Sequence, residues 1–485
     1  MRLTTTSVSV IFLLLHFAIA ILVPNFDDEA YYALWSRDLA LGYYDHPPMI
    51  AYFIHLGVQI FGETPLGLRF VSILTVVASG MLVGDMARRL WPDLRSIAPT
   101  ATLFFHLNSL VFTLGSFATP DAPSLFFWIA ALWAALYAIH TEPQSRVSLS
   151  WWCVTGLFIG LGVLSKFTNA FLALGLLAYI FGTAKGRVFL QTKFPYLAIL
   201  AAILPVIPYL LWNIETDWLG LERQSERLSS EQFTPNYLLE YGALLLLAPT
   251  PLVTYFAFLG LRTGLRARMP DMAFLNLPAL PLFLYFFYHS THAQVQVNWI
   301  VPLQGYIALL AAYGLCQIKA IRYWRALSTG LAIFMSFGLI FAAFNPYVPF
   351  GQADNPPNQT RGWTATRAEI EQTLKETGAT WIATVEYSQT GMLALQFSEY
   401  DVWSLKQLQR YGFRGAFSVA LCDAPALFIE RTNRVDEFSS QASALFESVG
   451  APRILHRQAL ELPLMSYVAT PVLGVLSTDL CPDAP

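Results

Sequence analysis

Residues 25–48, NFDDEAYYALWSRDLALGYYDHPP, bring together side chains that can move a proton. The stretch contains five acids and one histidine: Asp27, Asp28, Glu29, Asp38, Asp45 and His46. A carboxylate that is partly removed from water can act as a general base on a hydroxyl group. We therefore predict Asp28 or Glu29 as this base. The alternative is that the three consecutive acids only cap a helix, whose positive end favours negative charge.

Two further charged residues lie in short turns between apolar runs. Asp121 stands in TPDAP and Lys166 in LSKFTN. An ammonium group at headgroup depth suits a lipid phosphate, and the alternative is a lysine that only reaches towards water. Asp121 is predicted as another catalytic acid. The alternative is a helix start, with Thr119 as the N-cap, Pro120 at the first position and Asp121 favouring the dipole.

Other side chains are predicted to hold the phosphate or sugar of a donor: Asp45, His46, Arg69, Arg223, Arg227, His292, Asn298 and Trp299. Polar groups beside an aromatic ring suit a sugar, but interfacial tryptophans are also common in membrane proteins. The alternative for the three arginines is a solvated loop charge, and for His46 a loop residue with local hydrogen bonds. The acids could also hold a divalent cation against a phosphate, but no spacing requires one, so the metal stays open.

The composition places these residues in a membrane protein. The chain has 485 residues, of which 55% are hydrophobic and only 13% charged, and its mean hydropathy is +0.49. Soluble domains are about 45–50% apolar and about 25% charged. A soluble protein is therefore excluded, and the sequence has no basic tail or nucleic-acid-binding motif.

Eleven apolar runs are long enough to cross a bilayer as helices. They are residues 5–23, 66–84, 97–117, 121–140, 147–165, 167–184, 194–213, 236–260, 272–289, 298–317 and 327–345. We interpret the first run as a retained helix and not a cleaved signal peptide. Every second connection is rich in Lys and Arg, which is the positive-inside pattern. This alternation places the 24–65 loop, Asp121 and Lys166 together on the outer side of the membrane.

The outer loop at 24–65 is predicted to contain a helix over DEAYYALWSRDLALG, which YYDHPP stops. We expect this helix to lie along the membrane surface with its Tyr and Trp side chains at headgroup depth. Residues 1–345 are predicted as the transmembrane catalytic domain.

Residues 346–485 are predicted as a separate outer α/β domain. RAEIEQTLKETG has the spacing of an amphipathic helix, and TWIATVEY and APALFIER have that of strands. Cys422 and Cys481 fall in this domain, and the sequence leaves open whether they form a disulfide.

Six short motifs in order resemble those of bacterial glycosyltransferase family 39 and of the related lipid A aminoarabinose transferases. They are DDEAYY at 27–32, YYDHPP at 43–48, TPDAP at 119–123, LSKFT at 164–168, NWIVP at 298–302 and RGW at 361–363. The resemblance spans the membrane region and reaches into the outer domain. It implies a polytopic α-helical membrane protein of the GT-C type.

The resemblance also implies transfer of a sugar from a polyprenyl (undecaprenyl) phosphate to an acceptor hydroxyl on the periplasmic side of the bacterial inner membrane. The anomeric carbon is inverted, and Asp28 matches the position of the general base. Asp45 and His46 match a position where aminoarabinose transferases carry Glu and Lys, so this departure counts against an aminoarabinose donor. Trp363 either covers the cavity or is a core residue.

The acceptor is expected to be lipid A, lipopolysaccharide or another envelope glycan. A protein O-mannosyltransferase and an O-antigen-type polymerase or ligase are alternatives with related chemistry. A transporter or flippase is the alternative from another class, but transporters usually carry ionisable groups near the bilayer midplane and show repeated halves. No such repeat is evident, and the charged span ends gather on one face.

Overall fold

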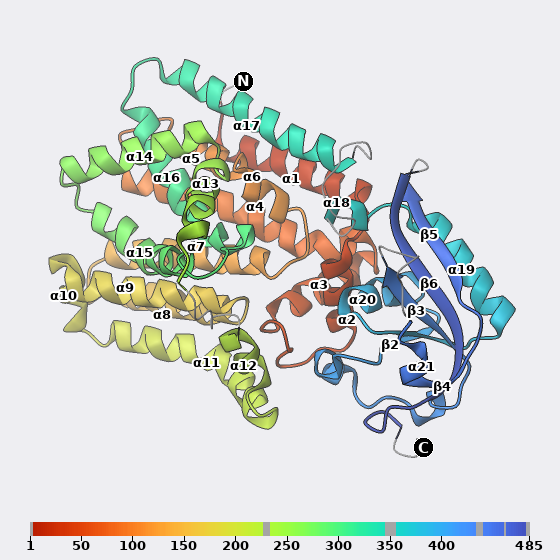
Figure 1. The fold of residues 1–485 in the computed structure, drawn as a ribbon. Coiled ribbons are helices and arrows are strands. Elements are labelled where there is room, and N and C mark those ends of the chain that lie inside the picture. The colour runs from red at the N-terminus through yellow and green to blue at the C-terminus, as the bar shows by residue number, and fades with distance from the viewer. Residues whose placement is uncertain (1–2, 227–232, 345–355, 433–439, 460–461, 482–485) are drawn as a thin grey trace. The chain divides into compact units, whose positions relative to one another are not determined.

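The computed structural model describes residues 3–226, 233–344, 356–432, 440–459 and 462–481 (Figure 1). It divides into two compact units. The helical unit consists of residues 1–20, 41–62 and 69–338, and the C-terminal unit of residues 21–40, 63–68 and 339–485. The acidic segment that begins the first loop thus groups with the end of the chain. The two domains predicted with a boundary at residue 345 stay a prediction.

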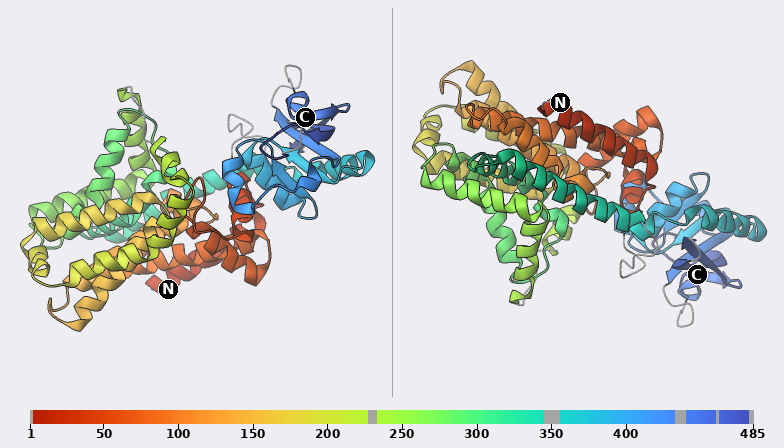
Figure 2. Two further views of the ribbon diagram at one scale, coloured as in Figure 1. Left: turned by 90° about the horizontal axis from the view of Figure 1, so that it is seen from below. Right: turned by 90° about the horizontal axis from the view of Figure 1, so that it is seen from above.

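The helical unit is a bundle in which many of the helices run alongside one another, while others cross them (Figure 2). Its helices are α1 (Thr5–Leu22), α3 (Met49–Phe61), α4 (Pro65–Leu90), α5 (Ile97–His106), α6 (Ser109–Leu114), α7 (Asp121–Ile139), α8 (Arg146–Val163), η1 (Phe167–Asn169), α9 (Ala170–Gly182), α10 (Ala184–Leu190), α11 (Phe194–Glu215), α12 (Leu219–Glu226), η2 (Pro235–Tyr237), α13 (Leu238–Leu247), α14 (Pro251–Arg266), α15 (Met272–His289), η3 (Val297–Leu303), α16 (Gln304–Cys316) and α17 (Ile321–Phe344).

Seven helices among the described residues are long and apolar enough to cross a membrane, or up to nine if each of two bent pairs counts as one span. These nine correspond to nine of the eleven predicted runs. Two runs predicted as continuous are bent or broken. The run at 236–260 turns by 90° between α13 and α14, where Thr250 has a positive φ and Pro251 begins the new helix. The run at 97–117 divides into α5 and α6, because the Asn108 side chain caps a new helix.

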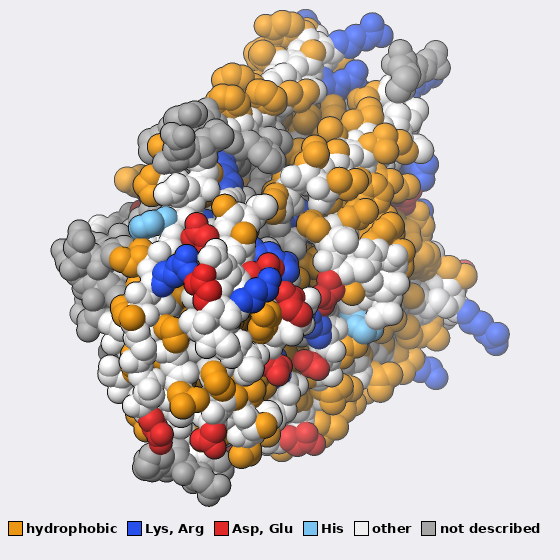
Figure 3. All heavy atoms as spheres, turned by 90° about the vertical axis from the view of Figure 1, so that its right-hand side faces the viewer, with side chains coloured by type: hydrophobic (Ala, Val, Ile, Leu, Met, Phe, Trp, Pro, Cys, Tyr) orange, Lys and Arg blue, Asp and Glu red, His pale blue; other side chains and the backbone are white. Residues whose placement is uncertain are grey.

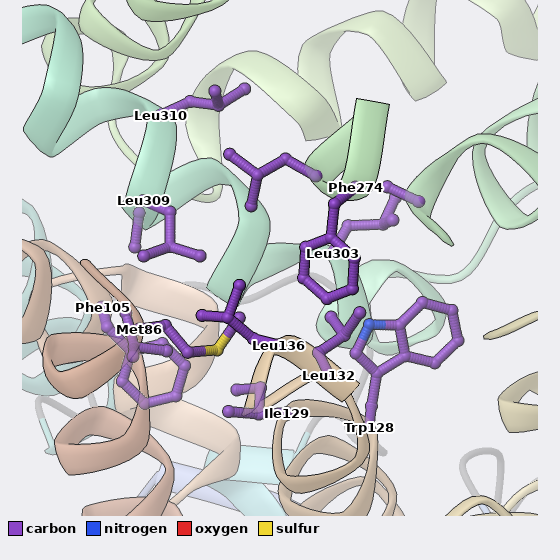
Figure 4. Packing of buried hydrophobic residues seen from close by; sticks show 14 of the residues in the cluster. Met86, Phe105, Trp128, Ile129, Leu132, Leu136, Phe274, Leu303, Leu309 and Leu310 are labelled. Atoms are coloured by element: carbon purple, nitrogen blue, oxygen red, sulfur yellow. The ribbon is translucent and has the colours of Figure 1, made fainter. Parts of the chain in front are cut away.

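Close helix packing in this unit depends on small residues. Gly156 and Gly160 of α8 lie so near the backbone of α11 that a Cβ at either position would come within 2.2 Å of a carbonyl oxygen. Small residues four apart allow such approach between membrane helices. The core around α7, α15 and α16 is filled with Leu, Phe and Trp side chains, including Trp128, Phe274 and Leu303 (Figure 4).

The C-terminal unit combines helices with one six-stranded sheet. Its elements are α2 (Asp27–Arg37), α18 (Pro356–Gln359), α19 (Trp363–Thr377), β1 (Trp381–Thr384), α20 (Tyr387–Gln396), β2 (Asp401–Ser404), η4 (Leu408–Arg414), η5 (Val419–Leu421), β3 (Ala426–Thr432), α21 (Ala442–Leu445), β4 (Phe446–Val449), β5 (Arg453–Ala459) and β6 (Leu462–Val475). The strand order is β2-β1-β3-β6-β4, with β5 also on β6. β1 is parallel to β2 and β3, and β6 is antiparallel to its neighbours.

The helix and the two strands predicted for this region are confirmed as α19, β1 and β3. Cys422 and Cys481 form a disulfide that ties the end of the chain to the segment before β3. Acidic and basic side chains mingle on the face shown in Figure 3. Arg453 and Glu376 form an exposed ion pair in this unit. Trp363 is a core residue, since it is buried, lies 5.9 Å from the Tyr467 ring and donates to a backbone carbonyl.

The predicted helix of the first loop is present as α2, but its surroundings differ from the prediction. Tyr31 is 1% exposed and Trp35 is fully buried, because α2 packs on α20 within the C-terminal unit. These aromatic side chains therefore pack within the protein, and their depth relative to the membrane stays a prediction. The helix ends at Arg37, before YYDHPP, and a second apolar helix, α3, follows within the same loop.

Candidate active site

The strongest cluster in the helical unit joins three predicted site residues. The carboxylate of Asp121 accepts a hydrogen bond from Lys166 Nζ at 2.7 Å on Oδ1, and another from Asn298 Nδ2 at 3.0 Å on Oδ2. The side chains of Asp121 and Lys166 are only 5% and 11% exposed. Lys166 is therefore a buried, paired cation, and the alternative of a lysine reaching towards water is wrong.

Three elements position this cluster. Asp121 is the first residue of α7, Lys166 follows the last turn of α8, and Asn298 lies in η3. The turn after α8 is held to α7 by a second contact, from Asn169 Nδ2 to Ser124 Oγ at 2.6 Å. The N-cap position of α7 is Pro120, without a side-chain cap, so the alternative in which Thr119 caps the helix is wrong.

The loop that carries Asp45 lies beside the same turn. The backbone N–H of Met49 donates to the carbonyl oxygen of Leu164, two residues before Lys166. Asp45 is buried, with Arg223 Nε 3.8 Å from its Oδ1, and Gln224 donates to its backbone oxygen at 2.7 Å. The Arg223 side chain is 28% exposed, so it is half-buried and not a fully solvated charge.

The remaining predicted ligands of the helical unit have separate surroundings. Arg69 is fully buried, with its guanidinium 4.9 Å from the centre of the Phe117 ring, so the alternative of a solvated charge is wrong for it. His46 is half-buried. His292 packs on Tyr288, and the Trp299 ring lies 5.2 Å from that of His289. Arg227 lies outside the described residues.

The three consecutive acids of α2 have three different partners, all within the C-terminal unit. Asp27 pairs with Arg431 at 2.8 Å. Glu29 accepts from the backbone N–H of Phe26 at 3.4 Å, so it caps the helix as the alternative interpretation proposed. Asp28 accepts from the hydroxyl group of Tyr387 at 3.3 Å, which is long for such a bond. The convergence of Asp28 with Asp121 and Lys166 stays a prediction, because it joins residues of different units.

A metal-binding cluster is not evident in the described part of the chain. No group of three or more His, Cys, Asp or Glu side chains there has the arrangement to hold an ion. The metal therefore stays open, as it was from the sequence.

The sequence reasoning missed Arg431 and Tyr387. Arg431 follows Glu430 in the otherwise apolar strand ALFIERT, and buried charges in such a strand need partners. That composition could have indicated a paired arginine. No local signal indicated Tyr387, whose partner lies 359 residues away.

The chain matches known proteins over different lengths. A family model described as dolichyl-phosphate-mannose-protein mannosyltransferase matches residues 45–212. An undecaprenyl phosphate-alpha-4-amino-4-deoxy-L-arabinose arabinosyl transferase of Pseudomonas aeruginosa is 32% identical over 219 residues, which cover 41% of this chain and 39% of the relative. The lipid A galacturonosyltransferase RgtD of Rhizobium johnstonii is 26% identical, with 59% of this chain and 61% of that protein covered.

Solved structures match over nearly the whole chain. ArnT from Cupriavidus metallidurans bound to undecaprenyl phosphate has a TM-score of 0.68 at 16% identity, and the match covers 96% of this chain and 97% of ArnT. The apo form of the same protein gives a TM-score of 0.63. The chain spans about two fifths of the length of the curated Pseudomonas relative.

The fold defines a polytopic membrane protein of the GT-C type, with a C-terminal unit built on a sheet. The resemblance to the PMT- and ArnT-like glycosyltransferases of family 39, first seen in six short motifs, is confirmed by the family model and the curated relatives. The solved structures share the fold.

Proposed function

We propose that this protein is a membrane glycosyltransferase that moves a sugar from a polyprenyl phosphate to an acceptor hydroxyl group. The relatives named for undecaprenyl-phosphate-linked sugars and for lipid A support this donor and an acceptor in the lipid A or envelope glycan class. We place the protein in the bacterial inner membrane and its reaction on the periplasmic face. The disulfide between Cys422 and Cys481 supports that side, because disulfides persist in oxidising compartments.

The reaction is a single displacement. The acceptor oxygen attacks the anomeric carbon as the bond from that carbon to the phosphate oxygen breaks, and the phosphate leaves with the electron pair. Asp28 takes the acceptor proton as general base. Positive groups stabilise the negative charge that develops on the departing phosphate. Lys166 is the first candidate for this task, with Arg69 and Arg223 as further candidates.

The cluster in which Lys166 and Asn298 both donate to the buried Asp121 carboxylate is the observation that carries the proposal. An ammonium group has three donors, and the contact with Asp121 uses one of them. Asp121 accepts on both oxygens, which suits it better to orient Lys166 and Asn298 than to take a proton itself. We therefore assign Asp121 a positioning role and keep Asp28 as the base.

Binding of undecaprenyl phosphate to the purified full-length protein tests the donor site. Lys166→Ala is expected to weaken this binding about tenfold or more, because a charge-assisted contact with the phosphate is lost. Since that change also leaves Asp121 buried without its cation, the double variant Asp121→Asn with Lys166→Met removes both charges together. Lys185→Ala is the matched control, because Lys185 pairs with Asp271 at a half-exposed site. Wild-type affinity in the folded double variant would contradict a phosphate role for Lys166.

Mass spectrometry of envelope glycolipids and glycoproteins from a deletion strain tests the acceptor. Loss of one sugar from lipid A or another envelope glycan is the expected result. Loss from proteins instead would favour the protein O-mannosyltransferase alternative, to which the description of the family model points. Unchanged glycans would contradict sugar transfer altogether.

A further inference from the structure

The C-terminal unit holds the first turn of α2 through contacts from several elements. Besides the Arg431 pair, the backbone N–H of Asp27 donates to Gln359 Oε1 of α18 at 3.2 Å. The Tyr31 hydroxyl group donates to the carbonyl oxygen of Arg410 at 3.3 Å. These contacts join α2 to α18, η4 and β3, which are more than 320 residues later in the chain.

The approach of α2 to α20 is too close for any side chain at the contact. A Cβ on Gly391 of α20 would lie 2.7 Å from the backbone nitrogen of Tyr31. Real Cβ atoms essentially never come this close to another heavy atom. The two helices therefore meet backbone to backbone, which fixes α2 in one position on α20.

Tyr387, the first residue of α20, is itself held on several sides. The Arg410 guanidinium lies 4.3 Å from the centre of its ring, a cation–π contact that fixes the plane of the ring. The Tyr31 ring meets it edge-on at 5.1 Å. The hydroxyl group of Tyr411 donates to the Tyr387 backbone oxygen at 3.0 Å. The phenol that contacts Asp28 is thus an oriented donor.

Five other charged residues lie on the elements of this unit that carry or contact α2. They are Asp27 and Glu29 on α2, Glu386 before α20, Arg410 on η4 and Arg431 on β3. Arg431 pairs with Asp27 and lies 3.9 Å from Glu386, and Glu29 is engaged by the backbone at Phe26. The acid directly before Asp28 is therefore neutralised, which lowers the repulsion that an ionised Asp28 would meet.

We propose that Tyr387 is a positioning residue for the general base: its hydroxyl group orients the Asp28 carboxylate and favours its ionised form, while Arg431 neutralises the adjacent Asp27. The inference rests on the proposed function, in which Asp28 is the base. It makes the C-terminal unit a part of the catalytic apparatus, because the sheet and α20 supply groups that prepare Asp28 for proton transfer.

The effect of Tyr387→Phe on the pH dependence of transfer tests this proposal. The enzyme stays in membranes of a deletion strain that carries each variant, and mass spectrometry follows transfer from the cell's own lipid-linked donor between about pH 5 and 9. We expect the rate of transfer to fall about tenfold while the purified variant binds undecaprenyl phosphate as the wild type does, because a group that acts on the base alters the chemical step more than donor binding. We also expect the acidic limb of the profile to move up by about half a pH unit, because the ionised carboxylate loses a donor.

Tyr411→Phe is the matched control. It removes a hydroxyl group from the same aromatic cluster, but that group contacts a backbone oxygen and not Asp28. The control should keep the wild-type acidic limb even if its stability falls. If Tyr387→Phe leaves the acidic limb of the pH profile unmoved while transfer still requires Asp28, the positioning role of Tyr387 is overturned and the proposed transferase activity still stands. Full activity of Asp28→Asn would instead overturn both the base and the role of Tyr387.

Discussion

Lys166 with Asp121 and Arg431 with Asp27 form two buried ion pairs, one in each unit. Both join residues far apart in the sequence, and both salt-bridge distances are short, at 2.7 and 2.8 Å. The cations differ in kind. A lysine ammonium is a compact point charge with three rotatable donors, whereas an arginine guanidinium is a planar fork that fixes geometry. The first pair suits a charge that must also meet a substrate, and the second suits a fixed support.

The acids of the two pairs have correspondingly different neighbours. Both carboxylate oxygens of Asp121 accept hydrogen bonds from side chains, so Asp121 can hold Lys166 and Asn298 in place. Asp27 pairs with Arg431, which offsets its negative charge and so lowers its repulsion of Asp28. Three consecutive acids that look alike in sequence thus have three tasks: an ion pair at Asp27, a contact with Tyr387 at Asp28 and a helix cap at Glu29.

The largest effect is expected for Asp28→Asn, which should lower transfer about 10³-fold, because the general base is lost while the shape of the side chain is kept. Glu29→Gln is its neighbour control and should retain most of the activity, because a glutamine oxygen can still accept from the Phe26 N–H at the start of the helix. Transfer by the deletion-strain membranes measures both, with thermal unfolding of each purified variant as the check on folding. Near-normal turnover of Asp28→Asn would remove it as the base.

The second largest effect is expected on stability, at the buried ion pair of Arg431 with Asp27. Arg431→Gln should lower the free energy of unfolding by about 3–5 kcal/mol, because it leaves the buried Asp27 carboxylate without its cation. The double variant Asp27→Asn with Arg431→Gln should recover part of this loss, since no buried charge then remains unpaired. Thermal or denaturant unfolding of the full-length protein provides the measurement. A single variant as stable as the double variant would show that the unpaired Asp27 carboxylate costs no stability.

The next effect is expected at the disulfide, which is in the C-terminal unit. Cys422 and Cys481 are joined, whereas Cys153 and Cys316 in the helical unit are free. Replacing Cys422 and Cys481 by serine should lower stability by about 2–4 kcal/mol, because the disulfide no longer constrains the unfolded chain. Labelling of the denatured protein with a thiol reagent should modify two cysteines before reduction and four after it. Four labelled cysteines before reduction would rule the disulfide out.

The smallest effect is expected for a pair on the surface. Arg453 and Glu376 lie 3.1 Å apart, but their side chains are 42% and 53% exposed. Arg453→Gln should therefore lower stability by about 1 kcal/mol or less, since water and salt screen the attraction. The same unfolding assay measures it, and a loss as large as that of Arg431→Gln would mean that burial does not decide what an ion pair contributes.

Local sequence carried enough information for the kind of protein and for many of its elements. Apolar runs of about twenty residues indicate membrane helices because the thickness of the bilayer sets that length. Seven of the eleven runs correspond to described helices that are long and apolar enough to cross a membrane, or nine if each bent pair counts as one span. The helix α2 and the elements α19, β1 and β3 follow from spacing alone. Lys166 was singled out because lysine is scarce in the outer connections, and Asp121 because it lies on the same predicted face and in one of the six motifs.

Only the tertiary structure decided which side chains meet. Asn298 reaches Asp121 across 177 residues, and Arg431 reaches Asp27 across 404, and no periodicity in the sequence records such distances. The bend after α13 and the burial of Tyr31 and Trp35 were missed for a related reason. Hydrophobicity shows that a side chain avoids water. Both lipid and a packed protein interior remove the side chain from water, so only the tertiary structure shows which of the two surrounds it.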